Sequence, residues 1–133
     1  MKPRLLLDTH VVVRWLVEPK RLSRDQARLL TQAVRLQGQV AVSAMTLVEF
    51  AILLGGRIDR MKMQMDEVFG ELEMNPIFQI LPITIEIAKE VDFLQPLRDP
   101  GDRVIVATAR VHGLRLLTSD PRIIQSNFVS TVE

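Results

Sequence analysis

The 133-residue sequence contains no cysteine and only two histidines, His10 and His112. Disulfide bonds and thiolate metal sites are therefore excluded, and a zinc site is not expected. Any metal must be held by oxygen ligands. No apolar run approaches the ~18 uncharged residues of a membrane-spanning helix. The apolar part of the start, residues 5–7, is too short for a signal peptide. We therefore expect a cytoplasmic protein.

Glycine-rich phosphate-binding loops are also absent. The first apolar segment, residues 5–7, is followed directly by Asp8, Thr9 and His10, which excludes a P-loop and a dinucleotide-binding fingerprint. A haloacid-dehalogenase-like phosphatase needs a second aspartate where this chain has His10. A response-regulator receiver needs an acceptor aspartate at the end of its central strand, where residues 81–84 read Leu-Pro-Ile-Thr. With two histidines, no Ser-His-acid arrangement is persuasive.

What is present is an ordinary globular composition, 47% hydrophobic and 25% charged. A chain of this size buries roughly two thirds of its unfolded surface, which is enough for one hydrophobic core. No linker, internal repeat or low-complexity segment divides it. We expect residues 1–133 to form a single domain.

Charge is distributed unevenly along the chain. Residues 1–35 carry eight bases and three acids, a balance of +5, whereas residues 36–133 carry nine bases and thirteen acids, a balance of −4. A basic first third can steer a polyanion toward an acidic centre, because local potential governs encounter. A solvated helix face explains the same pattern equally well.

Strand and helix patterns alternate from end to end. Apolar segments predict strands at residues 4–7, 39–42, 77–81, 114–117 and, more briefly, near 128–132. Capping residues, glycines and prolines delimit the predicted helices at residues 10–17, 23–38, 43–55, 61–74, 84–94 and 102–111. Strands separated by helices require crossover connections. The pattern therefore predicts an α/β fold, with a mainly parallel central sheet of four to five strands flanked by helices.

Four carboxylates occupy positions where such a fold exposes polar side chains at one edge of its sheet. They are Asp8, Glu49, Asp102 and Asp120. Ligands of parallel α/β sheets bind beyond the carboxyl ends of the strands, where Asp8 and Asp120 fall. Four carboxylates held together repel one another, so either their pKa values rise or a hard divalent metal lies between them.

Each of these acids also has an ordinary structural explanation. Asp8 and Asp102 can each cap a helix, and capping is the simpler explanation for Asp8 taken alone. Residues 99–102, Asp-Pro-Gly-Asp, form a plain turn sequence, and Asp120 followed by Pro121 reads as another turn.

Glu49 is harder to explain structurally. Its helical neighbours are Met45, Thr46, Ile52 and Leu53, of which three are apolar, so Glu49 should lie on or beside a buried stripe. A buried charge without a partner costs several kcal/mol. Glu49 must therefore pair with a base, take up a proton or bind a metal.

Four segments in this order resemble a known family. They are residues 5–10 with Trp15, residues 42–44 followed by Glu49, residues 98–109, and residues 117–120. No single segment is specific, but the four in order are similar to the PIN-domain ribonucleases. More narrowly, they resemble the VapC-like toxins of bacterial toxin-antitoxin pairs. The similarity spans residues 5–121.

The resemblance implies a PIN-like three-layer fold and a set of site residues. The acidic quartet of the family falls on Asp8, Glu49, Asp102 and Asp120 as metal ligands, and the hydroxyl of Thr118 supports the site. Asp99 and Asp102 are both candidates for the third acid. The family pattern, in which the acid directly precedes the apolar helix, selects Asp102 and leaves Asp99 in a supporting position.

The activity implied is that of an endoribonuclease that hydrolyses RNA phosphodiester bonds with carboxylate-bound Mg²⁺ or Mn²⁺. The implied partners are the RNA substrate, a cognate antitoxin protein and a second copy in a homodimer. Candidate phosphate contacts are Arg14, Lys20, Arg21 and Arg103. Two other classes remain open: a non-catalytic PIN-like module that binds RNA or protein, and a metal-dependent phosphatase.

Overall fold

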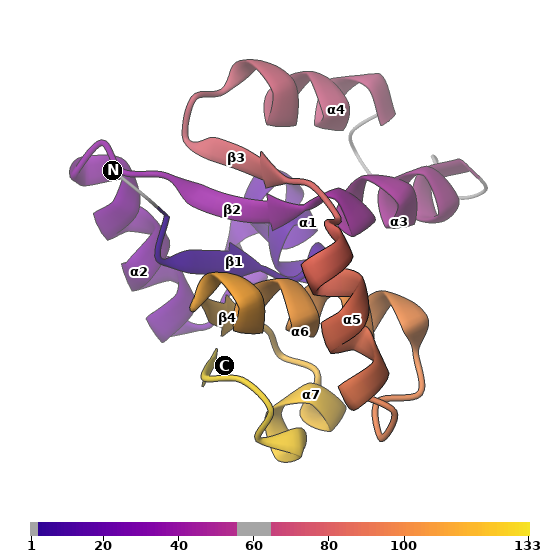
Figure 1. Cartoon of the computed structure of the whole chain (residues 1–133). Coiled ribbons are helices and arrows are strands. Elements are labelled where there is room, and N and C mark those ends of the chain that lie inside the picture. Colours follow the sequence, from indigo (N-terminus) through magenta and orange to yellow (C-terminus); the bar gives the residue numbers. More distant parts are fainter. Residues whose placement is uncertain (1–2, 56–64) are drawn as a thin grey trace.

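Five parallel strands form one sheet in the order β3-β2-β1-β4-β5 (Figure 1). The computed structural model describes residues 3–55 and 65–133. The strands are β1 (Leu5–Leu7), β2 (Val40–Ser43), β3 (Phe78–Leu81), β4 (Arg115–Leu117) and β5 (Thr131–Val132). The predicted α/β fold with a mainly parallel sheet is confirmed.

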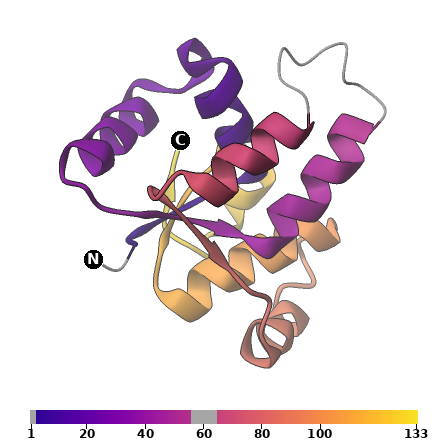
Figure 2. The same ribbon diagram turned by 90° about the horizontal axis from the view of Figure 1, so that it is seen from above.

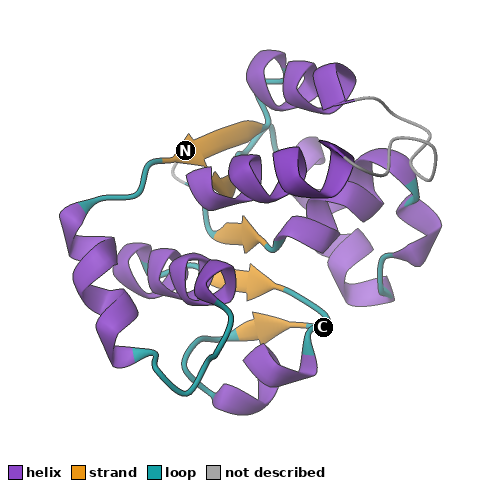
Figure 3. Cartoon of the chain, turned by 90° about the vertical axis from the view of Figure 1, so that its right-hand side faces the viewer, coloured by secondary structure: helices purple, strands orange, loops and turns teal. Residues whose placement is uncertain are grey.

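Helices cover both faces of this sheet. They are α1 (Thr9–Val17), the short 3-10 helix η1 (Pro19–Arg21), α2 (Arg24–Arg35), α3 (Ala44–Gly55), α4 (Met65–Met74), α5 (Ile85–Phe93), α6 (Pro100–His112) and α7 (Pro121–Ser126). Figure 2 places α5 and α6 on the opposite side of the strands from α2 and α4. Figure 3 shows the strands as one layer between helices. None of the helices in these described ranges has the length and apolar character of a membrane-spanning segment.

The central strand shows why the layers form. Every residue of β1 is buried, and successive side chains point to opposite faces. Leu5 and Leu7 join the core beneath α1, α2 and α4, whereas Leu6 joins the core beneath α5, α6 and α7. A strand buried on both sides reads as a continuous apolar run, which is the pattern that predicted it.

The ends of α2 follow the sequence signals, with one displacement. At its start, the Ser23 hydroxyl accepts from the backbone N–H of Gln26 at 3.0 Å, and the Gln26 side chain accepts from the N–H of Ser23 at 3.3 Å. At its end, Gly38 was the expected stop. The left-handed residue is instead Gln37, with φ of 53°, and the Gly38 N–H donates to the carbonyl of Ala33 at 2.9 Å.

Three local expectations were wrong or incomplete. The Asp120-Pro121 turn opens a helix, α7, that the sequence did not predict. The last strand covers only Thr131–Val132 rather than residues 128–132. The helix predicted at 61–74 is seen from Met65, and residues 61–64 lie outside the described part.

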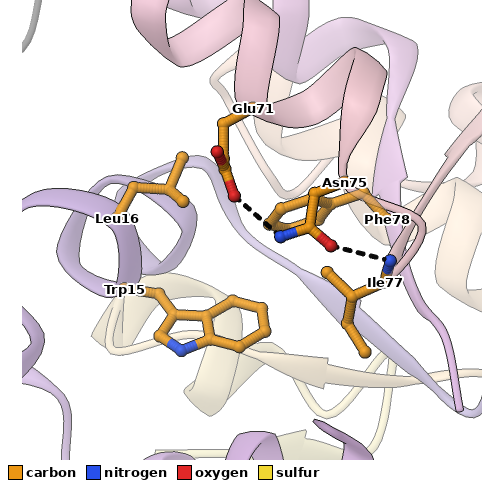
Figure 4. A pocket seen from close by; sticks show the side chains of 6 residues that line it. All are labelled: Trp15, Leu16, Glu71, Asn75, Ile77 and Phe78. Atoms are coloured by element: carbon orange, nitrogen blue, oxygen red, sulfur yellow. Dashed lines mark hydrogen bonds between the residues drawn. The ribbon is translucent and has the colours of Figure 1, made fainter. Parts of the chain in front are cut away.

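A small hollow of about 210 Å³ lies where α4 turns into β3 (Figure 4). The Asn75 side-chain amide donates to Glu71 Oε1 at 2.7 Å, and Asn75 Oδ1 accepts from the Ile77 N–H at 3.0 Å. Trp15 packs edge-on against Phe78 with ring centroids 5.5 Å apart. None of the four predicted site acids lines this hollow. The contacts therefore serve the connection from α4 to β3.

Candidate active site

The predicted acids meet where the order of the sheet changes direction. The chain starts at the central strand β1, moves outward through β2 and β3, and returns to the other side of β1 with β4. Such a switch point leaves a crevice at the carboxyl ends of the strands. Asp8 directly follows β1, and its N–H donates to the carbonyl of Leu117 in β4 at 3.0 Å. Thr118 and Asp120 follow β4.

Asp8 is both a helix cap and a member of this cluster. It is buried, with 4% of its surface exposed. Its Oδ1 accepts from the N–H of Thr9 at 2.8 Å at the start of α1, and its Oδ2 accepts from the hydroxyl of Thr118 at 2.7 Å. The Thr118 oxygen accepts in turn from the N–H of Asp120 at 3.1 Å. One hydroxyl thus ties together the ends of β1 and β4.

Glu49 enters the cluster from α3 through two threonines. The Thr9 hydroxyl donates to Glu49 Oε1 at 2.6 Å. Because that proton is used, the Thr46 hydroxyl must donate to the Thr9 oxygen, 3.0 Å away. Burial raises the pKa of Glu49, the Thr9 bond lowers it, and the charges of Asp8 and Asp99 raise it further.

The predicted buried stripe around Glu49 exists on one side only. Thr46 and Phe50 are fully buried, whereas Val48 and Ile52 are exposed. Glu49 is half-buried at the border between these two sides of α3. The carboxylate therefore lies at the rim of the core, where solvent or a ligand can reach it.

Asp99 and Asp102 have separate roles at the start of α6. Asp99 is the N-cap, and its Oδ1 accepts from the N–H of Asp102 at 3.0 Å. Capping by Asp102 was therefore the wrong alternative, because Asp102 lies within the first turn of a helix that begins at Pro100. Its carboxylate makes no hydrogen bond within the described part of the chain. It is therefore available for a ligand.

Asp102 is the acid most strongly affected by the others. Desolvation by burial, then the charges of Asp99, Asp8, Asp120 and Glu49, raise the pKa of Asp102 from 3.8 to about 7. All three other members of the predicted quartet contribute to this shift. The four acids, from four separate segments, therefore share one electrostatic environment.

Asp120 is held by an arginine. Its Oδ1 accepts from the backbone N–H of Arg122 at 2.9 Å, and the Arg122 guanidinium donates to both of its oxygens at 3.3 Å. The hydrogen bond and charge of Asp120 raise the pKa of the exposed Arg122. The Arg122 guanidinium and a metal would compete for the Asp120 carboxylate.

His10 lies beside the predicted acids, although no role in the site was predicted for it. Its Nε2 accepts from the backbone N–H of Ser119 at 3.0 Å, so the proton of the neutral ring lies on Nδ1, 3.4 Å from Asp8 Oδ2. Burial, the largest influence, lowers the pKa of His10. The neutral ring joins α1 to the segment that carries Asp120. The sequence signal for this role is the position of His10, two residues after Asp8.

The arginines predicted to contact phosphate have different surroundings in the structure. Arg103 donates to the backbone carbonyls of Leu97 and Gln95, so its guanidinium holds the loop before α6 and is not free for phosphate. Arg21 lies 3.5 Å from Glu18. Arg14 donates to Ser119 Oγ at 3.2 Å and so lies at the site edge.

A cleft adjoins the acids on the side of α7. Its volume is about 580 Å³, and Asp99 and Asp102 lie in its wall together with Arg98 and Arg122. Arg98 is a cation beside the acids that suits a phosphate group, whereas the Arg122 guanidinium is bound to Asp120. The cleft offers space for a ligand next to the carboxylates.

The donor set fits a hard divalent cation by its chemistry. Within the described ranges, no three histidine or acidic side chains are arranged to hold a metal ion as they stand. The four acids nevertheless supply only oxygen, and the pKa of Asp102 is raised first by burial and then by the negative charges of the neighbouring acids. Oxygen ligands with excess negative charge are what Mg²⁺ and Mn²⁺ select.

Comparisons with known proteins show which family the chain is similar to. The PIN domain profile matches residues 5–128. Ribonuclease VapC22 of Mycobacterium tuberculosis is 32% identical over 121 residues, which cover 90% of this chain and 88% of that protein.

Solved structures share the fold. The DNA-bound VapBC crystal structure from Salmonella typhimurium superposes with a TM-score of 0.71 at 14% identity, covering 98% of both chains. A toxin-antitoxin complex from Klebsiella pneumoniae gives a TM-score of 0.65 at 22% identity, covering 97% of this chain and 96% of that one. With the fold, the profile match and the sequence identity in agreement, the chain belongs to the PIN-domain family.

Proposed function

We propose that this chain is a metal-dependent endoribonuclease and the toxin of a toxin-antitoxin pair. One observation carries the proposal: carboxylates from four distant segments gather at the switch point of the sheet, beside a cleft with two arginines. The similarity to a mycobacterial ribonuclease and to a toxin-antitoxin complex supports the same activity. The RNA target is not encoded in a motif, because RNA recognition rests on shape and loop contacts.

The proposed metal ligands are Asp8, Glu49, Asp102 and Asp120. When bound, Mg²⁺ or Mn²⁺ supplies positive charge against the scissile phosphate and promotes deprotonation of an attacking water. The Thr118 hydroxyl fixes the orientation of Asp8, and Thr9 does the same for Glu49. Arg98 and Arg122 line the cleft where the RNA strand would pass, and their guanidinium groups suit phosphate oxygens.

The proposal extends to partners and location. A cognate antitoxin would bind the chain and block cleavage, and a second copy would complete a homodimer. We expect the protein to act in the cytoplasm as a single domain. Size-exclusion chromatography with light scattering tests the dimer, and co-expression with any small protein encoded beside this gene tests the antitoxin.

A cleavage assay separates the three candidate functions. The proposed ribonuclease cleaves structured RNA with Mg²⁺ or Mn²⁺ and stops in EDTA, without hydrolysing a chromogenic phosphoester. A phosphatase gives the reverse substrate preference. A non-catalytic module acts on neither substrate, and that result would exclude the proposed activity.

A metal titration tests the ligands without RNA. Metal that binds only the native state stabilises it by about 2.7 kcal/mol at 100 times the dissociation constant, so the melting temperature should rise with Mn²⁺. Glu49→Gln should reduce this shift while the chain stays folded, because the amide keeps the volume and loses the charge. No shift in the wild type at millimolar metal would make the acids structural.

A further inference from the structure

Helix α2 carries a row of polar and positively charged side chains along its exposed side. Its members recur every three or four positions, so they share one face of the helix. The row consists of Arg24, Arg28, Thr31 and Arg35, all of them exposed. The opposite face of α2 is buried through Gln26 and Leu30. The row therefore contributes nothing to the core, and packing does not explain its arginines.

The row borders a shallow hollow of about 520 Å³. Its lining consists of Arg24, Ala27, Arg28, Thr31, Gln32 and Arg35. The lining contains no acid, and alanine is its only apolar residue. The aromatic residues and methionine that accompany arginine in the cores of protein interfaces are absent from this lining. Arginine guanidinium groups with neighbouring hydroxyl and amide donors are typical contacts to a nucleic-acid backbone.

The positive charge of the row is largely unneutralised. Among residues 3–55 and 65–133, neither Arg24 nor Arg35 has a carboxylate within ion-pair distance. Arg28 lies 3.5 Å from Asp25, but both side chains are well exposed, and such pairs are weak. A polyanion can therefore displace Asp25 at little cost.

The row begins at the edge of the active site. The Gln26 side-chain amide, in the first turn of α2, donates to the Val132 carbonyl at 3.1 Å and to Ser119 Oγ at 3.5 Å. Arg14 donates to the same Ser119 oxygen at 3.2 Å, and Asp120 is the next residue. From there α2 extends for 12 residues, or ~18 Å, and leads to the start of β2, at the edge of the sheet opposite the acids. Ser119 thus joins Arg14 to the first turn of α2, where the row begins.

We propose that this face of α2 is a second binding surface for the phosphate backbone of RNA, separate from the catalytic acids. The inference rests on the proposed ribonuclease function and makes its substrate class more specific. The substrate is an RNA long enough to reach from the acids across α2. The arginines hold this distal part of the strand and take no part in bond cleavage.

A pair of matched double variants tests the surface. Arg24→Gln with Arg35→Gln removes two charges from the row, and Lys89→Gln with Arg110→Gln removes two exposed charges from α5 and α6, on the opposite side of the sheet from α2 (Figure 2). Binding of a labelled single-stranded RNA is measured in EDTA, by fluorescence anisotropy over a range of salt concentrations. Loss of two phosphate contacts should reduce the slope of log K against log salt by about 1.4, or roughly 25-fold in affinity at 0.1 M salt. The control pair should keep the wild-type slope.

A charge change of the opposite sign gives a second test. Asp25→Asn removes the carboxylate beside Arg28 and should tighten RNA binding at low salt. With metal present, the Arg24/Arg35 variant should cleave a very short RNA at the wild-type rate and a long RNA more slowly at subsaturating concentration.

Two results would overturn the α2 proposal. One is the same salt slope in both double variants. The other is unchanged RNA affinity together with weaker capture of an acidic partner protein, which would assign the face to protein. A wild type that binds RNA through α2 but cleaves none with Mg²⁺ or Mn²⁺ would instead remove the proposed catalytic function.

Discussion

Gly101 lies so close to Glu49 that a Cβ atom at position 101 would stand 2.8 Å from the glutamate Oε2. The same atom would lie 3.1 Å from Asp99 Oδ1. A contact of 2.8 Å between a carbon and an oxygen atom is too short, so a side chain at position 101 must displace the flexible end of Glu49. The absent side chain of Gly101 therefore leaves room for the Glu49 carboxylate beside the start of α6.

We therefore expect Gly101→Ala to lower RNA cleavage at least tenfold, because it moves Glu49. Because the Glu49 carboxylate is the end of a flexible side chain, its displacement should cost little stability. Gly70→Ala is the matched control, since nothing lies within 4 Å of a Cβ there and alanine favours a helix by about 0.5–1 kcal/mol. Cleavage rates and urea unfolding measure both effects. Wild-type cleavage by Gly101→Ala would mean that the position of Glu49 does not matter.

The two aspartates at the start of α6 should separate stability from activity. Asp99→Asn keeps a capping residue and should be nearly neutral, whereas Asp99→Ala should cost ~1 kcal/mol of stability. Asp102→Asn should leave the cap intact and abolish the Mn²⁺-dependent melting shift. Thermal unfolding with and without Mn²⁺ distinguishes these variants. An equal loss of metal response in Asp99→Asn and Asp102→Asn would contradict the assignment of Asp102.

Thr118 offers a test of orientation by a single hydroxyl. Thr118→Val keeps the shape but removes the donor to Asp8 and the acceptor for the Asp120 N–H, so cleavage should fall at least tenfold. The unpaired buried groups should cost about 1–3 kcal/mol. Thr118→Ser keeps both hydrogen bonds and should restore most of the activity. If serine and valine variants behaved alike, the hydroxyl would have no role in the site.

The raised pKa of Asp102 predicts a pH dependence of stability in the metal-free protein. The folded pKa, about 7, exceeds the ordinary value of 3.8, so the folded state binds more protons than the unfolded state between these values. The cost of ionising Asp102 is therefore absent below pH 3.8 and complete above about pH 7. Stability should decrease across this window.

The difference between two proteins isolates this effect. In EDTA, the melting temperature of Asp102→Asn should rise relative to wild type as the pH increases from about 4 to 7, and level off above. Groups common to both proteins, such as His10, largely cancel in the difference. A constant difference over this range would mean that the Asp102 pKa is not raised.

The strands, and the positions of the predicted acids at the ends of strands, could be predicted from the sequence because both depend on local pattern. Residues 5–7 and 40–42 are continuous apolar runs, and such a run, buried on both faces, is typical of a central strand in a parallel sheet. The carboxyl ends of such strands then meet at one edge. Asp8 and Asp120 can be chosen as candidates because each follows a predicted strand, without any knowledge of distant contacts.

Features that depend on contacts between distant segments were not predictable in this way. The residues around Gly101 in the sequence indicate only a turn. Its contact with Glu49 arises from the packing of α3 on α6, which the local sequence does not reveal. The Asp120-Pro121 pair suits a turn and a helix start equally, so α7 was missed. The hydrogen bonds from Arg103 to backbone carbonyls likewise depend on the conformation of the loop before α6, which the sequence does not reveal.

The central position of β1 has a consequence for synthesis. Asp8 leaves the ribosome well before its partner Thr118, which lies 110 residues later. Until β4 emerges, β1 lacks one of its two neighbouring strands, and the Asp8 carboxylate lacks the hydroxyl that orients it. A nascent chain, or a fragment truncated before residue 118, should therefore be inert. The activity of this domain would therefore arise only after residue 118 has been translated.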